Sequence, residues 1–294
     1  MSDYIIASSS TADLTRDYLD AHGIPFIRYS FTVNDQLRED DCREESRAAI
    51  YAGMRRGDEL KTSMINEYSY ADFFRGLLDR GKDVIFLDMS EKMSVSYENA
   101  LRAAETVRAE YPQRQLYVMD TRCISGGLGL LVKNMVRRQE AGESFEQVIA
   151  WGEENKLKIA HRFTVDDLKY LKRGGRVSNA SALVGSLLNI KPVLYVPDEG
   201  TLDVVKKARG RRAALKSIID GVVHDLNRCD SEGTEFMILH ADCRADAEYV
   251  RDEIKKACPQ VGKTEISSLG VVIGAHCGPG LLTVFYRCGG RRPD

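Results

Sequence analysis

The chain has 294 residues, of which 43% are hydrophobic and 29% are charged. This length and apolar content are typical of one large or two ordinary folded domains and exclude long disordered stretches. Its 42 Lys and Arg residues nearly balance its 44 Asp and Glu residues, for a net charge of −2. General nucleic-acid binding, which requires a basic excess, is therefore not expected.

The sequence also bears on the compartment. No apolar run approaches the roughly 18 residues of a membrane span, and the start, Met1-Ser2-Asp3-Tyr4, lacks the pattern of a secretory signal. Seven cysteines are widely scattered without a Cys-x-x-Cys pair, which favours free thiols over disulfides or a metal site. We expect a soluble cytoplasmic protein with no integral membrane span.

The first part of the chain alternates apolar runs with amphipathic patterns. Strands are predicted at 4–7, 84–87 and 116–119, and helices at 69–81, 96–110 and 128–136. The spacing of Ser10 and Asp13 predicts a helix from Thr11 toward Leu19, and a second capping box begins at Ser144. Continuous apolar strands between amphipathic helices indicate a parallel sheet covered on both faces.

The pattern changes near residue 156. Strands are then predicted at 158–165, 192–196, 202–206, 236–239 and 282–286, and helices at 167–171, around 183–188, at 211–228 and at 243–257. The segment Pro197-Asp198-Glu199-Gly200 is a turn signal between two of these strands, so this half contains an antiparallel hairpin.

Hydroxyl side chains follow the predicted parallel strands, where ligands bind in open α/β sheets. They occur at 8–11, at 90, 94 and 96, and at 121 and 125, and a further group at 61–63 precedes a helix. Hydroxyls and free N–H groups at helix starts can hold the oxygens of an anion. For any single residue, a role in a helix cap or turn is the better explanation, but less so for four such groups at one edge of a sheet. No glycine-rich phosphate-binding motif occurs, so ATP binding by this chain is not expected.

Two segments of the second half are more specific. Lys172-Arg173-Gly174-Gly175-Arg176 gathers three cations on a glycine turn, which suits a phosphate or an acidic partner as well as a solvated loop. His276 lies among four glycines between 270 and 280, which predicts a turn and favours a role in a site over a place in the core.

Five motifs, in this order along the chain, together resemble the DegV family: Ser9–Leu14, Lys61–Ser63, Ser90–Tyr97, Leu171–Ser178 and Gly274–Gly280. The resemblance implies a two-domain α/β fold. Residues 1–156 would form an N-terminal Rossmann-like domain with a parallel sheet, and residues 157–294 a C-terminal α/β domain with a mixed sheet. One long-chain fatty acid would bind between the two.

The resemblance also implies a function. The chain would be a carrier, not an enzyme, that presents palmitate, stearate or oleate to a separate ATP-dependent fatty acid kinase subunit for acyl-phosphate formation, without a cofactor. The fatty acid carboxylate would be held by Thr62, Ser63, Ser94 and His276. The kinase would be contacted by Arg173 and Arg176.

The motifs depart from the family pattern at Ser9, where Asp is usual, and at Lys92 and Val95, where Gly is usual. An alternative is an acyl esterase or thioesterase that uses Ser94 or Cys277 as nucleophile with His276 as base. No Gly-x-Ser-x-Gly elbow occurs to support it.

Overall fold

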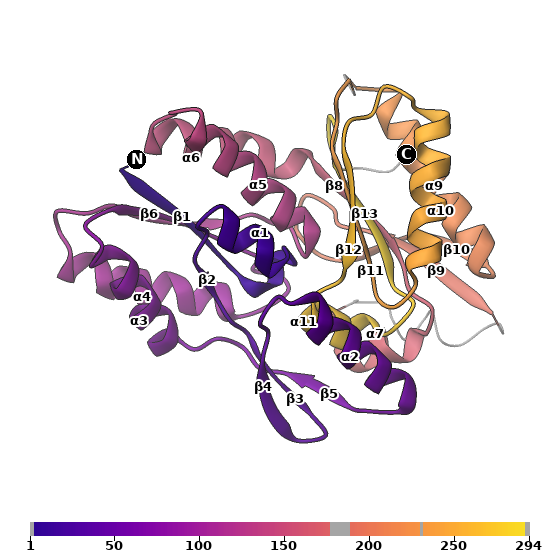
Figure 1. The fold of residues 1–294 in the computed structure, drawn as a ribbon, viewed down its shortest axis with the longest axis horizontal. Coiled ribbons are helices and arrows are strands. Elements are labelled where there is room, and N and C mark those ends of the chain that lie inside the picture. The colour runs from indigo at the N-terminus through magenta and orange to yellow at the C-terminus, as the bar shows by residue number, and fades with distance from the viewer. Residues whose placement is uncertain (1–2, 177–188, 230–231, 292–294) are drawn as a thin grey trace.

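The fold places a parallel sheet and a mixed sheet side by side, each with helices packed against it (Figure 1). The computed structural model describes residues 3–176, 189–229 and 232–291. The predicted α/β class, with a parallel and a mixed sheet, is confirmed. Within these ranges, no helix combines the length and the apolar character needed to cross a bilayer.

The first sheet is parallel throughout, as its continuous apolar strands predict. Its order is β2–β1–β6–β7, formed by β1 (Tyr4–Ser9), β2 (Phe26–Ile27), β6 (Asp83–Asp88) and β7 (Leu116–Asp120). One face is covered by α3 (Glu67–Leu78) and α4 (Ser96–Glu110), and the other by α5 (Gly126–Glu140) and α6 (Phe145–Asn155) (Figure 1). The capping box predicted at Ser144 is present at the start of α6.

The helix predicted from Thr11 is wrong. Ser10–Ala12 form one short 3-10 turn that ends at Asp13, whose φ of 55° is left-handed. The Asp13 carboxylate is fully buried and accepts a hydrogen bond from Ser125 instead of capping a helix. The helix α1 (Arg16–Ala21) begins only after Thr15, whose side chain caps it.

A three-stranded antiparallel sheet, which the sequence pattern did not predict, lies beside the parallel sheet. It consists of β3 (Ser30–Val33), β4 (Gln36–Glu39) and β5 (Leu60–Thr62), with α2 (Glu44–Arg56) between β4 and β5 in the chain. Thr62 therefore ends a strand of this small sheet, and not of the parallel sheet.

The second large sheet has the order β10–β9–β8–β13–β11–β12. Its strands are β8 (Ile159–Thr164), β9 (Ile190–Tyr195), β10 (Asp203–Arg209), β11 (Phe236–His240), β12 (Thr264–Ser268) and β13 (Leu282–Arg287). The predicted hairpin is present as the antiparallel pair β9–β10, and β11–β12 is parallel, so the sheet is mixed. The helix predicted around 183–188 lies outside the described residues.

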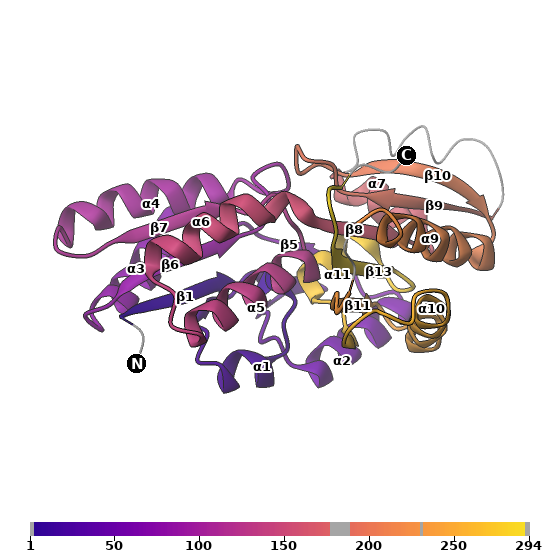
Figure 2. The ribbon, with the colours of Figure 1, turned by 90° about the horizontal axis from the view of Figure 1, so that it is seen from above.

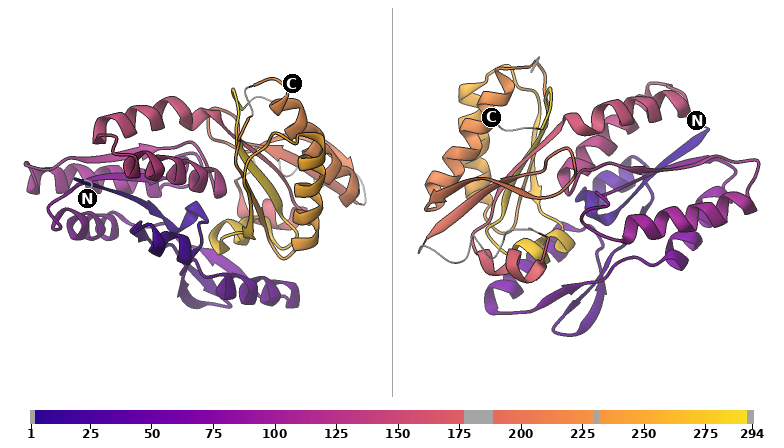
Figure 3. Two further views of the ribbon diagram at one scale, coloured as in Figure 1. Left: turned by 45° about the horizontal axis from the view of Figure 1, so that its top comes forward. Right: turned by 180° about the vertical axis from the view of Figure 1, so that it is seen from behind.

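The described part of this half contains the helices α7 (Leu168–Gly174), α9 (Arg211–Leu226), α10 (Arg244–Ala257) and α11 (Val271–Cys277). Two of them, α9 and α10, cover the outer face of the mixed sheet (Figure 3). The short helices α7 and α11 pack on each other, and α11 also contacts β5 of the small sheet. The expectation that His276 lies in a turn is wrong, because residues 271–277 are helical.

Helix α5 lies between the two large sheets (Figure 2). It packs on β1 and β6 on one side and on β8, β11 and β13 on the other. At its N-terminus the backbone comes so close to the mixed sheet that a Cβ on Gly127 would lie 2.1 Å from the His161 ring. The largest apolar core consequently continues from one half to the other, and the domain boundary near residue 156 stays a prediction.

Candidate functional site

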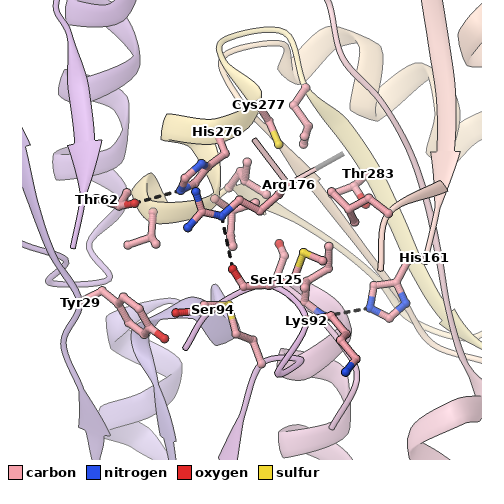
Figure 4. Close-up of a pocket in the computed structure, with 18 of the residues that line it drawn as sticks. Tyr29, Thr62, Lys92, Ser94, Ser125, His161, Arg176, His276, Cys277 and Thr283 are labelled. Carbon is pink, nitrogen blue, oxygen red and sulfur yellow. Dashed lines mark hydrogen bonds between the residues drawn. The ribbon is translucent and has the colours of Figure 1, made fainter. Parts of the chain in front are cut away.

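A cavity of about 420 Å³ lies between the two halves, near the N-terminus of α5 (Figure 4). This volume is within the range of small-molecule sites. Its polar lining includes Tyr29, Thr62, Ser63, Ser94, Arg176 and His276. Its apolar lining includes Met89, Ile124, Phe163, Val272, Leu281 and Phe285. Four residues expected to hold a carboxylate, Thr62, Ser63, Ser94 and His276, therefore line one cavity.

Thr62 and His276 form the closest polar pair in this group. Thr62 Oγ1 lies 2.9 Å from His276 Nε2, joining β5 to α11 (Figure 4). The other ring nitrogen faces the Gly174 backbone, whose hydrogen bond favours the protonated ring. In the neutral ring with the proton on Nδ1, Nδ1–H donates to the Gly174 carbonyl. Nε2 then accepts a hydrogen bond from the Thr62 hydroxyl.

The imidazole is neutral at physiological pH. Burial, together with Arg176, lowers the pKa of His276 to about 4. In the free protein His276 can therefore offer an anion a hydrogen bond but no positive charge. Arg176 is the cation that lines the cavity beside it, and its guanidinium donates to the Met93 and Gly174 carbonyls.

Ser94 lies in the loop between β6 and α4. Its hydroxyl donates to Ser96 Oγ at 2.9 Å, and Ser96 Oγ also accepts the Ile65 N–H. The Ser94 hydroxyl also accepts the Ser96 N–H. Ser94 is thus linked to the start of α4 and faces the cavity at the same time.

Comparison with known proteins adds to this geometry. A sequence profile described as "Uncharacterised protein, DegV family" matches residues 5–288. A DegV domain-containing protein of Clostridium perfringens is 35% identical over 97% of this chain and 98% of its own length. The chain belongs to the DegV family.

Solved structures of DegV proteins share the fold. A DegV family protein from Thermus thermophilus, for which fatty acid binding is described, is 27% identical and superposes with a TM-score of 0.86 over 97% of this chain and 99% of that one. A DegV lipid-binding protein from Thermotoga maritima is 25% identical, with a TM-score of 0.84 over 99% of this chain and all of the other.

The two arginines of the DegV loop motif lie in different surroundings. Arg176 lines the cavity, whereas Arg173 is exposed on α7 and stacks over the Tyr170 ring at 5.2 Å. The sequence grouped them as one set of cations. The structure separates them because α7 ends at Gly174 and the chain then turns at Gly175, whose φ is 67°.

The three residues that depart from the DegV pattern lie in different places. Lys92 and Val95 both line the cavity, and Lys92 Nζ pairs with Glu91 at 2.8 Å. Ser9 does not line it, and instead donates to the buried Asp88 carboxylate at 2.8 Å.

Several of the other hydroxyls have structural roles, as the capping alternative allowed. Ser8 donates to the Leu87 carbonyl, Ser90 to the Gly200 carbonyl and Thr121 to the Asp88 carbonyl. Ser125 lines the cavity and donates to Asp13. Over the described ranges, no group of three or more His, Cys, Asp or Glu side chains is placed to hold a metal ion.

Sequence reasoning missed Tyr29. Its side chain lines the cavity beside Ser94 (Figure 4), and its hydroxyl is buried without a hydrogen-bond partner among the residues that the structure describes. Burial raises the pKa of Tyr29 well above its ordinary value, so the phenol keeps its proton. No motif marks this residue, because it precedes β3 of the small sheet that was not predicted.

Proposed function

We propose that this DegV protein binds one long-chain fatty acid, such as palmitate, stearate or oleate, in the cavity between its halves. The carboxylate is held by Thr62, Ser63, Ser94 and His276, and the chain lies among the apolar side chains. The observation that carries the proposal is the grouping of these polar residues in a cavity with apolar walls. The fatty acid binding described for the Thermus relative supports it.

The energetics agree with this assignment. Burying a sixteen-carbon chain at about 0.8 kcal/mol per CH₂ contributes on the order of 12 kcal/mol, from which association costs subtract several. A buried carboxylate requires hydrogen-bond donors and is stabilised by a nearby cation. The hydroxyls of Thr62 and Ser94 are the donors, and Arg176 is the cation. Such binding requires no cofactor.

We further propose that the protein is a carrier that presents the fatty acid to a separate ATP-dependent kinase subunit. The exposed cations of α7, Lys169, Lys172 and Arg173, are available to a partner surface because they lie outside the cavity. The separation of Arg173 from the cavity supports a division between partner contact and ligand contact.

Native mass spectrometry of the protein purified from cells tests the first proposal. We expect a co-purified mass of one long-chain fatty acid, and we expect added palmitate or oleate to bind to protein that has been delipidated. A protein that carries no acyl chain and binds neither fatty acid would contradict fatty acid binding.

The esterase alternative is weaker than the carrier. Ser94 donates to Ser96 and not to His276, and burial raises the pKa of the Cys277 thiol to about 12, which leaves almost no thiolate. Thr62 does contact the imidazole, but a pKa of about 4 makes His276 a weak base. We expect no turnover of p-nitrophenyl palmitate. Turnover that is abolished by Thr62→Val, Ser94→Ala or Cys277→Ala would restore the alternative.

A further inference from the structure

Two hydrogen-bonded pairs lead from the cavity toward the buried end of β6. On the cavity side, Ser94 donates to Ser96 at 2.9 Å. On the sheet side, Tyr70 of α3 donates to Asp88 Oδ2 at 2.6 Å. Ser96, Tyr70 and Asp88 are all fully buried. The Tyr70–Asp88 pair is therefore shielded from solvent, which strengthens its electrostatic effect, whereas the Ser94–Ser96 pair is partly buried at the cavity wall.

Tyr29 stands between these pairs. Its buried hydroxyl meets the geometric criteria of a hydrogen bond with no group in the described ranges, but the hydroxyls of Ser96, Ser94 and Tyr70 lie close enough to be its partners. A buried hydroxyl without a partner is costly and is rarely kept without a reason. Tyr29 is thus positioned to join the two pairs into one chain of four hydroxyls that ends at Asp88.

The direction of the protons in this chain matters, because each hydroxyl carries only one. In the free protein, the Tyr70 hydroxyl donates a hydrogen bond to Asp88 and the Ser94 hydroxyl donates one to Ser96. Both O–H groups therefore point away from the cavity. An ionised carboxylate of a ligand has no proton to donate, so it can only accept hydrogen bonds. To bind it, Ser94 turns its O–H toward the cavity. Ser96 Oγ then keeps the Ile65 N–H as a donor and is free to accept a second hydrogen bond from Tyr29.

A change in the direction of these hydrogen bonds would also affect Asp88. If Tyr29 donates to Ser96 and Tyr70 in turn donates to Tyr29, Asp88 Oδ2 loses the donor that it has in the free protein. Asp88 Oδ1 keeps Ser9 and the Met89 N–H. Among the described residues, no Lys, Arg or His side chain hydrogen-bonds or ion-pairs with this carboxylate, and Asp120 of β7 repels it. Burial already raises the pKa of Asp88 to about 6.

We propose that Asp88 is a positioning residue for the ligand's head group: as a carboxylate binds at Ser94, Asp88 takes up one proton from solvent and donates it to Tyr70. All four hydroxyls then point their protons toward the cavity. One proton enters for each carboxylate bound, so the net charge of the protein with its ligand equals that of the protein alone. This inference rests on the proposed function.

Other titratable groups face the chain or its ligand. Asp120 faces Asp88 from the neighbouring strand, while His276 and Arg176 face the head group from the far side of the cavity. Glu91, Lys92 and His161 also line the cavity, and Lys92 pairs with Glu91. His276 is the competing site of proton uptake, since an anion beside it also favours its charged form. Variants of Asp88 and His276 therefore have to be compared in one experiment.

The test is calorimetric titration of delipidated protein with oleate at about pH 7.5, in buffers that differ in ionisation enthalpy. For the wild type we expect uptake of about one proton per oleate and an affinity that falls roughly tenfold per pH unit above about pH 7. In Asp88→Asn the amide donates to Tyr70 permanently. We expect proton uptake near zero and an affinity that no longer depends on pH and equals or exceeds that of the wild type.

Three further variants complete the test. Tyr29→Phe interrupts the chain and should abolish proton uptake while weakening oleate binding severalfold, so it carries the test if Asp88→Asn does not fold. His276→Gln should keep the uptake. Asp13→Asn removes a carboxylate that is equally buried but hydrogen-bonds to Ser125, and it should also keep the uptake.

The outcomes are distinct. Oleate binding by the wild type without proton uptake, or with uptake that persists in Asp88→Asn or Tyr29→Phe, would overturn the inference alone. Loss of uptake in His276→Gln would assign the proton to the imidazole and would overturn it as well. Absence of oleate binding in every protein, the wild type included, would overturn the proposed function itself.

Discussion

The side chains that we propose to hold the carboxylate are neutral. Thr62, Ser94 and Tyr29 present hydroxyls, and the adjacent imidazole of His276 is uncharged because burial lowers its pKa to about 4. Attraction of an anion therefore depends on hydrogen bonds and on two cavity-lining cations, Arg176 and the Glu91-paired Lys92, whose side chains are exposed to screening by salt. Specificity for a carboxylate then comes from the number and placement of donors.

Removal of single donors tests this arrangement. Thr62→Val, which keeps the shape of the side chain, and Ser94→Ala should each weaken fatty acid binding by about 1–3 kcal/mol, because a buried carboxylate loses a hydrogen bond. The dissociation constant of oleate measures the effect. Thr106→Ala removes a hydroxyl from the exposed side of α4 and serves as the control, with no change expected. Unchanged affinity in both site variants would refute the placement of the head group.

The arginines are expected to differ. Arg176→Ala should weaken oleate binding by about 0.5–1 kcal/mol, a small effect because an exposed cation is screened. Arg173→Ala should leave oleate affinity intact and lower the rate at which a cognate kinase phosphorylates the bound fatty acid. Equal loss of oleate affinity in both variants would contradict the separation of the two residues.

At the scale of elements, the position of α11 depends on Gly274, which has no side chain. A Cβ at Gly274 would lie 2.2 Å from the Tyr51 hydroxyl, which donates to the Leu269 carbonyl at 3.0 Å. The glycine lets α11 approach α2 closely, and this approach brings His276 to Thr62.

Gly274→Ala should consequently destabilise the protein by about 1–3 kcal/mol and weaken fatty acid binding. Gly76→Ala is the matched control, because Gly76 is also helical but has nothing within 4 Å of an added Cβ. This control should stabilise slightly, by about 0.5–1 kcal/mol, as alanine is the better helix former. Thermal unfolding of both variants distinguishes the effects. Equal melting temperatures would show that α11 tolerates the added methyl group.

Elements with a strong periodic pattern were predictable from the sequence. The buried strands β1, β6 and β7 and the amphipathic helices α3 and α4 all occur where the pattern placed them. The small sheet was not predictable, because β4 is exposed along its whole length and β5 has three residues. Helix α11 was mistaken for a turn because its glycines suggested flexibility, whereas Gly274 serves close packing.

The site was predictable only through the family resemblance. Motifs placed Thr62 and His276 in one site, but these residues are 214 positions apart, and no periodicity could bring them together. No sequence pattern assigned Tyr29 or Asp88 to the site. Their roles depend on buried hydroxyls that come from separate elements and are visible only in three dimensions.

At the scale of the whole molecule, stability should depend on pH through Asp13. Burial raises its pKa from 3.8 to about 7. Between these values the folded state holds a proton that the unfolded state has released, so this contribution to stability is present at low pH and is lost as the pH rises toward about 7. The loss is up to about 4 kcal/mol.

Chemical denaturation at about pH 4.5 and about pH 7.5 measures this contribution. Asp13→Asn cannot titrate, so its free energy of unfolding should change less between the two pH values than that of the wild type. A variant with the same pH dependence as the wild type would show that Asp13 titrates normally in the folded protein.

Helix α5 has a consequence for recombination among DegV genes. Its residues were selected to fit β1 and β6 on one side and β8, β11 and β13 on the other. In a chimaera of two relatives joined near residue 156, α5 keeps its own β1 and β6. The strands β8, β11 and β13 on its other side come from the second parent. At Gly127, where the backbone abuts His161, even one methyl group on the incoming helix would not fit. We therefore expect functional chimaeras only between parents that match at this helix, so the two halves must evolve as a pair.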